Sequence, residues 1–178
     1  MVLRNTSASF GGVSRALHWG MAALIIVSLA VIELSDLAPK GSEWRRGMRD
    51  WHAQIGLIVL ALVWFRLFWK LASVEPDIVP KPAALQRWAA HIVEWTFYAL
   101  MVGLPLLGIA MMQADGKPVA LLGMSLPVVV GVDKVWAHRL EDIHEWLGNA
   151  MMVLIGVHVG AALWHGYVLR DNTLARMR

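Results

Sequence analysis

Residues 146–169 read WLGNAMMVLIGVHVGAALWHGYVL, and none of them carries a formal charge. A helix that crosses the hydrocarbon core of a bilayer needs about 20 mostly apolar residues. This stretch therefore predicts a membrane-spanning helix, and the helix contains two histidines, His158 and His165. Ionisable side chains at membrane depth are costly and are usually retained for a function. The histidines are therefore the first candidates for a functional site.

Three further stretches lack Asp, Glu, Lys and Arg, namely residues 16–32, 51–65 and 95–114. The second is short, but Arg66 and Lys70 can snorkel to the membrane surface and extend the span. Tryptophans cluster near the ends of these stretches, as in the aromatic belts of membrane proteins. We therefore expect an all-α fold, an integral membrane four-helix bundle formed by a single domain, 1–178. Its helices are expected at about 15–35, 51–70, 88–112 and 143–169.

The composition narrows the chemistry that is open to the chain. It is 58% hydrophobic and 16% charged, whereas a soluble domain is about 45–50% apolar and roughly 25% charged. The absence of cysteine excludes disulfides, iron–sulfur clusters, zinc thiolate sites and covalently attached c-type haem. The net charge of +3 is ordinary for a protein whose loops meet anionic lipid. No basic helix or aromatic–basic pattern is present, so we expect a lipid bilayer as partner and no nucleic acid.

Four histidines fall at two matching depths. His18 lies near the start of the first expected helix, and His52 lies near the start of the second, which runs back. On the fourth helix, His144 and His158 are 14 residues apart, which is about 21 Å along the axis, and they face the same way to within about 40°. The pairs are therefore His52 with His144 and His18 with His158. Because imidazole is a common ligand of haem iron, the pairs predict two bis-histidine haem sites.

Other interpretations of these residues stay open. A buried histidine also serves as a hydrogen-bond partner between helices, although four at matching depths make this an unusual coincidence. His91 lies at the depth of His18 and is a rival ligand. His165 is either a propionate or quinone contact or a solvated interfacial residue, and Arg15 is either such a contact or a positive-inside arginine. Five glycines near the histidines leave room for a porphyrin, namely Gly20, Gly56, Gly148, Gly156 and Gly160.

Short strings along nearly the whole chain resemble one known family. They are SRALHW at residues 14–19, WHAQIG at 51–56, IVPKP at 78–82, GLPLLG at 103–108, IHE at 143–145, VHV at 157–159 and RDNTL at 170–174. In order and spacing the chain resembles the bacterial cytochrome b561 proteins, which are four-helix di-haem membrane cytochromes. The resemblance implies two haem b groups whose iron is held by His18, His52, His144 and His158. It also implies that the third helix supplies no ligand, which argues against His91.

The resemblance extends to a superoxide oxidase type within that family, in length and in the closing DNTL string. That type takes electrons from superoxide on the periplasmic side and passes them to ubiquinone. The resemblance therefore implies an oxidoreductase, a superoxide:ubiquinone oxidoreductase, in the bacterial inner membrane. Basic residues of the outer loops are candidates to steer the anion, namely Lys40, Arg45, Arg46, Arg49, Lys117 and Lys134.

Two other functions compete with this hypothesis. One is a cytochrome b subunit that receives electrons from a redox protein donor within a membrane-bound dehydrogenase or hydrogenase, although such subunits are longer. The other is a transporter whose histidines relay protons. Lys and Arg number nine on the side of the termini and seven on the other side, so we expect both termini in the cytoplasm. No cleavage site follows the first apolar run, so we expect the N-terminal segment not to be a signal peptide.

Overall fold

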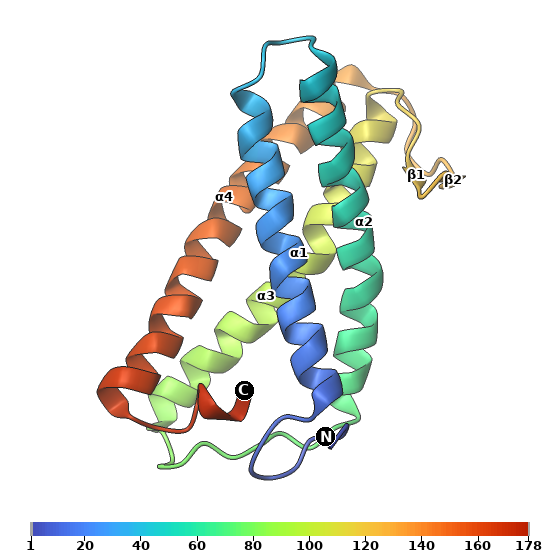
Figure 1. Cartoon of the computed structure of the whole chain (residues 1–178). Coiled ribbons are helices and arrows are strands. Elements are labelled where there is room, and N and C mark those ends of the chain that lie inside the picture. The colour runs from blue at the N-terminus through green and yellow to red at the C-terminus, as the bar shows by residue number, and fades with distance from the viewer. Residues whose placement is uncertain (1, 178) are drawn as a thin grey trace.

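Four long helices make up the protein in a computed structural model that describes residues 2–177 (Figure 1). They are α1 (Gly12–Asp36), α2 (Glu43–Leu71), α3 (Ala84–Ala114) and α4 (Lys134–Trp164). A π-helical turn, η1 (His165–Leu169), continues α4, and a 3-10 turn, η2 (Ala175–Met177), ends the chain. Between α3 and α4, the two-residue strands β1 (Ala120–Leu121) and β2 (Met124–Ser125) form an antiparallel hairpin.

The four helices are membrane helices by length and composition. Within residues 2–177, each is long and apolar enough to cross a bilayer. Large apolar side chains point outward from their middles, for example Ile26, Trp64, Phe65 and Val153, which are all more than half exposed. An apolar surface of this extent marks contact with lipid rather than with water. The expected all-α fold with four membrane-spanning helices is confirmed.

Every one of the four helices begins earlier than hydropathy predicts, and the difference is largest for α2 and α4. α2 begins at Glu43 rather than near residue 51, because the Ser42 side chain accepts a hydrogen bond from the backbone N–H of Arg45. α4 begins at Lys134 rather than near residue 143, because the Asp133 carboxylate accepts from Val135 and Trp136. Such caps stabilise a polar first turn in water, beyond the apolar part of the helix. At its other end α4 gives way to η1, so the expected range to residue 169 includes a π-helical turn.

The helices pack as two pairs. α1 packs along α2, α3 packs along α4, and α2 contacts α3, whereas α1 and α4 have almost no backbone contact. The buried core that joins the pairs consists of Met21, Ile55, Val59, Val63, Tyr98, Leu100, Met101 and Met151. Between α1 and α4, the side chains of His18 and His158 lie opposite each other.

Both termini lie at one end of the bundle, which we call the termini end (Figure 1). There, three segments distant in sequence are tied together by hydrogen bonds. The backbone N–H of Phe10 donates to the carbonyl of Arg176, and the N–H of Asp77 donates to Ser7. The Asn172 side chain accepts from the N–H of Val79 and donates to the carbonyl of Asp77. We call the opposite end, which carries the α1–α2 loop and the β hairpin, the hairpin end.

Candidate haem sites

Two pairs of imidazole rings face each other across the bundle. His18 of α1 and His158 of α4 have ring centres 6.3 Å apart, and His52 of α2 and His144 of α4 have ring centres 6.0 Å apart. A metal ion lies about 2 Å from an imidazole nitrogen, and the nitrogen lies about 1.1 Å from the ring centre. Two imidazoles on opposite sides of one ion thus have centres about 6 Å apart. Both pairs have this separation, and they are the pairs that helix depth predicts.

The His52 ring is held in one tautomer. Its Nδ1 lies 3.0 Å from the carbonyl oxygen of Ser28 and 3.0 Å from the Ser28 hydroxyl. A carbonyl oxygen can only accept, so Nδ1 carries the proton and donates it. Nε2 then keeps its lone pair, which is the state that a metal-ligating histidine requires. Its partner His144 rests against α3, where a Cβ added at Gly108 would lie 3.6 Å from Cε1 of the ring.

The pair at the termini end has a different setting. Nη2 of Arg66 lies 3.3 Å from Nδ1 of His18, and Phe97 packs edge-on against His158 with ring centres 5.3 Å apart. Arginine can only donate, so Nδ1 of His18 accepts in this arrangement. Ligation through Nε2 would place the proton on Nδ1 and release the guanidinium. The carboxylates of haem propionates are suitable acceptors for it.

Glycines provide room beside the hairpin-end pair. Gly56 follows His52 by one helical turn on the same face, and Gly148 follows His144 in the same way. Both are only partly exposed, yet a Cβ added at either would meet no atom within 4 Å. Glycine inside a helix costs about 0.5–1 kcal/mol relative to alanine. Space beside paired imidazoles is what a flat macrocycle needs, so the residues present fit haem.

Comparisons with known proteins agree with this geometry. The family model described as prokaryotic cytochrome b561 matches residues 9–178. The chain belongs to this family. It is 38% identical over 161 residues to cytochrome b561 homolog 1 of Escherichia coli (strain K12), covering 90% of this chain and 92% of that protein. It is 35% identical to a protein of Yersinia pestis named probable superoxide oxidase CybB, with 90% of each chain covered.

As a member of the cytochrome b561 family, the chain is a multi-pass bacterial membrane protein of electron transfer, and the family's cofactor is b-type haem. A third relative, cytochrome b561 homolog 2 of Escherichia coli (strain K12), is 27% identical over 99% of this chain. His18, His52, His144 and His158 are the residues that would hold haem here. Their neutral imidazoles would supply nitrogen ligands for the iron, and the haem would supply reversible one-electron chemistry.

His165 of this cytochrome b561 protein lies in η1 and pairs with a residue that sequence reasoning did not single out. Its Nδ1 is 2.5 Å from Oδ2 of Asp171, whose side chain is 5% exposed. The other carboxylate oxygen accepts from the backbone N–H of Thr173. Burial of Asp171 opposes its charge, but the hydrogen bonds from His165 and Thr173 outweigh burial and lower the pKa of the carboxyl. An Asp followed two residues later by Thr is the local signal for such a turn.

Arg15 and two further histidines, His91 and His138, occupy different settings. Arg15 lies in α1 one turn before His18 and is partly exposed, and its contact with a propionate or quinone stays a prediction. His91 is exposed and lies 3.9 Å from the Glu94 carboxylate, on its own helix. His138 is also exposed and lies 3.8 Å from Glu141. The structure therefore brings neither His91 nor His138 into the two ring pairs.

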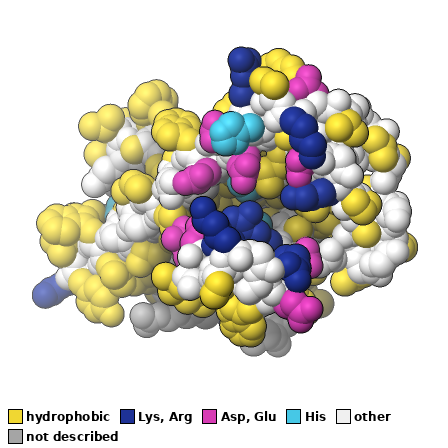
Figure 2. Space-filling view, turned by 90° about the horizontal axis from the view of Figure 1, so that it is seen from above, with side chains coloured by type: hydrophobic (Ala, Val, Ile, Leu, Met, Phe, Trp, Pro, Cys, Tyr) yellow, Lys and Arg dark blue, Asp and Glu magenta, His cyan; other side chains and the backbone are white. Residues whose placement is uncertain are grey.

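The basic residues of the hairpin end do not form a uniformly positive surface. Figure 2 looks down on this end and shows basic and acidic side chains gathered near its centre, with hydrophobic side chains around them. Arg45 is 2.6 Å from the Asp36 carboxylate, and Arg49 is 3.5 Å from it. Lys117 and Lys134 both pair with Asp115, at 2.8 Å and 2.6 Å. Steering of an anion here would therefore be local, because carboxylates offset much of the field.

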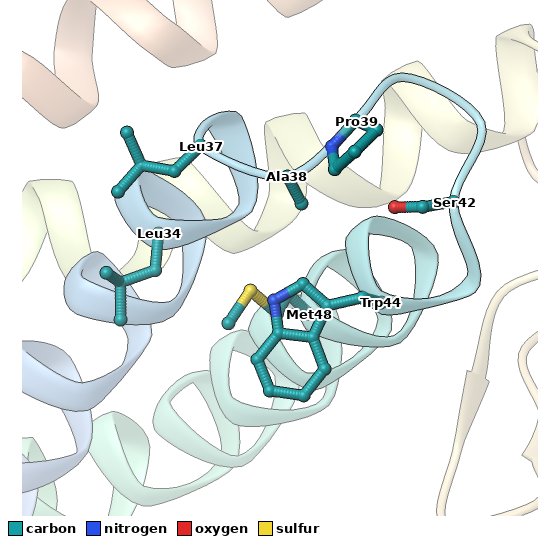
Figure 3. Close-up of a pocket in the computed structure, with 7 residues that line it drawn as sticks. All are labelled: Leu34, Leu37, Ala38, Pro39, Ser42, Trp44 and Met48. Atoms are coloured by element: carbon teal, nitrogen blue, oxygen red, sulfur yellow. The ribbon is translucent and has the colours of Figure 1, made fainter.

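A shallow groove at the hairpin end offers mainly apolar contacts (Figure 3). It has a volume of ≈ 510 Å³, and its lining residues are Leu34, Leu37, Ala38, Pro39, Ser42, Trp44 and Met48. Of the two lining side chains with polar atoms, Ser42 already caps α2, and Trp44 contributes an indole N–H group. The other lining residues are apolar, so the groove is suited to contact with an apolar chain.

Proposed function

We propose that this protein is a di-haem cytochrome that passes electrons through the bilayer from superoxide at the hairpin end to ubiquinone. The observation that carries the proposal is the pair of imidazole couples, with ring centres 6.0 Å and 6.3 Å apart, one toward each end of the bundle. His144 and His158 lie on one helix and set the spacing of the two sites, about 21 Å. The excess of Lys and Arg on the termini side supports a periplasmic hairpin end.

Superoxide is the favoured donor because a close relative bears the name probable superoxide oxidase and covers 90% of this chain. Each superoxide would lose one electron and become dioxygen. Two such electrons and two protons convert one ubiquinone to ubiquinol. The guanidinium of Arg46 donates to the backbone carbonyl of Gly41 at 2.5 Å, and its charge would contribute to local attraction of the anion.

The His165–Asp171 pair supports a quinone site at the termini end. His165 lies seven residues beyond His158, about 10 Å along α4, and its side chain is 21% exposed. Asp171 accepts from Nδ1 of His165, so a proton taken up at Nε2 would be stabilised by the Asp171 carboxylate and could pass to a bound carbonyl. Arg15, at the same end, would favour the negative charge that accompanies electron arrival.

The deciding experiment uses the purified protein in lipid nanodiscs that contain ubiquinone. A superoxide-generating enzyme supplies the donor, and ubiquinol formation is followed by absorbance. We expect ubiquinol to form, and we expect added superoxide dismutase or the His52→Ala change to prevent it. If dithionite reduces the protein but superoxide does not, the superoxide step is wrong, and the role of an electron-transfer subunit for a partner dehydrogenase becomes the better explanation.

A further inference from the structure

The connection between α3 and α4 contains an uncharged stretch that is too short to cross a membrane. Residues 118–132 read PVALLGMSLPVVVGV, and charged residues stand only at the borders, namely Asp115, Lys117, Asp133 and Lys134. A crossing helix needs about 20 residues, and this stretch instead turns back through the β1–β2 hairpin. The stretch is as apolar as a membrane-spanning segment, but it is too short to span a membrane and it does not form a helix.

Within this stretch Val119 is buried, but several larger apolar side chains do not pack into the protein. Leu122, Met124, Val128, Val129 and Val132 are each between 68% and 76% exposed. Figure 1 shows the hairpin reaching sideways from the bundle beside α2, instead of lying across the end of the helices. Exposed apolar side chains gathered in one segment mark an interaction site. This segment contacts α2, one of the four helices long and apolar enough to cross a membrane.

Two glutamines of the membrane helices satisfy the backbone of the stretch. Gln54 of α2 donates to the carbonyl of Ala120 at 2.7 Å and accepts from the N–H of Leu122 at 2.9 Å. Gln113 of α3, which is only 3% exposed, holds the second half of the stretch. It donates to the carbonyl of Pro127 and accepts from the N–H groups of Val129 and Val130. A loop in water needs no such support, whereas an unpaired backbone group in lipid costs several kcal/mol.

A charged cluster marks the border of the stretch. Lys117 and Lys134 both pair with Asp115, directly after the end of α3 and at the start of α4. The hydrogen bond from Lys117, together with that from Lys134, lowers the pKa of Asp115 to about 2. The cluster therefore remains charged at any physiological pH and belongs in water or among lipid headgroups.

We propose that residues 118–132 form an interfacial anchor, whose exposed apolar side chains lie in the lipid of the leaflet at the hairpin end. The anchor holds α2 through Gln54, two residues beyond His52, and it holds the end of α3 through Gln113. The occupant is lipid and not a second protein, because the stretch borders two membrane helices and its paired backbone groups suit a medium without water.

The test uses the absence of cysteine in the chain. Single cysteines are introduced as Leu122→Cys and Val129→Cys, with Lys40→Cys in the exposed α1–α2 loop at the same end as the matched control. Each is labelled with a small fluorophore, and one chain is placed in each nanodisc. We expect doxyl lipids to quench the labels at 122 and 129 several-fold more than the label at 40, and aqueous iodide to do the reverse.

Two results would overturn the proposal. Equal access of iodide to all three labels would place the stretch in water. Protection of the labels at 122 and 129 from both quenchers would show that protein, not lipid, covers them. Thermal unfolding of each labelled variant shows whether the substitution disturbs the bundle, and Met124→Cys replaces any variant that unfolds early. The readout uses no redox reaction, so failure of the superoxide hypothesis leaves it unaffected.

Discussion

Nδ1 of His52 in α2 lies 3.0 Å from the backbone carbonyl oxygen of Ser28 in α1. The contact joins two helices and fixes which nitrogen of the ring is free. Because the acceptor is a backbone group, no side-chain substitution at residue 28 removes it. The ligand state of His52 is thus built into the packing of α1 on α2, whereas Nδ1 of His18 meets a side chain, Arg66, that is able to move.

The first prediction concerns haem content. His52→Ala and His144→Ala should each remove the hairpin-end site, and His18→Ala and His158→Ala should each remove the other, because each site needs two opposed imidazoles. A pyridine haemochrome assay should fall from about two haems per chain to about one. The visible spectra of the intact proteins should then differ between the two groups of variants, because a different site remains occupied. His138→Ala, which alters an exposed ring, is the control. Identical residual spectra from all four variants would contradict the pairing.

The second prediction concerns the space beside His144. Gly148→Leu places a branched side chain where an added Cβ now meets no atom, so it should exclude haem from the hairpin-end site. Gly47→Leu is the matched control, because Gly47 is also a helix glycine with nothing within 4 Å but lies before His52, the one histidine of α2. Circular dichroism should show equal helicity for both variants. Retention of both haems in Gly148→Leu would show that the space serves another purpose.

The third prediction concerns Arg66. A cation near a redox centre favours the state with the extra electron, so Arg66→Met should lower the midpoint potential of the haem held by His18 and His158. A loss of about 1.4 kcal/mol in the stabilisation of the reduced state lowers the midpoint potential of a one-electron couple by about 60 mV. We therefore expect a shift of tens of millivolts. Arg66→Lys should keep most of the wild-type potential. A redox titration followed by visible spectra separates the two haems, and an equal shift at the His52–His144 site would contradict the assignment.

Some of this arrangement is readable from sequence because it depends on helix geometry alone. The 14 residues between His144 and His158 set both their separation and their shared face, so the pairing follows once the helices are placed. The starts of α2 and α4 are not readable from hydropathy, because Ser42 and Asp133 stabilise polar turns that lie outside the apolar stretches. Hydropathy identifies the residues that contact lipid, but it does not identify the residue at which a helix begins.

The contacts of single polar residues are the part that sequence does not provide. From its position in the sequence, Arg66 is expected to snorkel to the membrane surface. Only the packing of α1 on α2 brings its side chain to His18. Asp171 reaches His165 because the chain reverses at Arg170, which adopts a left-handed conformation with φ of 54°. A non-glycine residue with a left-handed backbone conformation is uncommon, and the sequence RDNTL contains no signal that predicts this conformation at Arg170.

The fourth prediction concerns pH and Asp171. Its pKa is lower in the folded protein than the unfolded value of about 3.9, so its charge stabilises the fold above that value. This contribution is lost as the pH falls through the lower, folded pKa. Asp171→Asn should therefore be less stable than wild type at pH 7 by about 1.5–3 kcal/mol, and the difference should shrink as the pH approaches about 3. Thermal unfolding in detergent at several pH values checks this, and a difference that grows on acidification would contradict it.

The last prediction tests whether Gln54 and Gln113 each stabilise a separate half of the 118–132 stretch. Gln113→Leu leaves the N–H groups of Val129 and Val130 without their acceptor, and a buried donor without a partner costs about 1–3 kcal/mol. A change of about 1.4 kcal/mol shifts an opening equilibrium constant tenfold. Hydrogen exchange at these two amides should therefore become about 10- to 100-fold faster. Gln54→Leu is the matched variant, and it should quicken exchange at Leu122 instead. If either variant released the whole stretch, the two halves would open as one unit, and the hairpin would depend on both helices together.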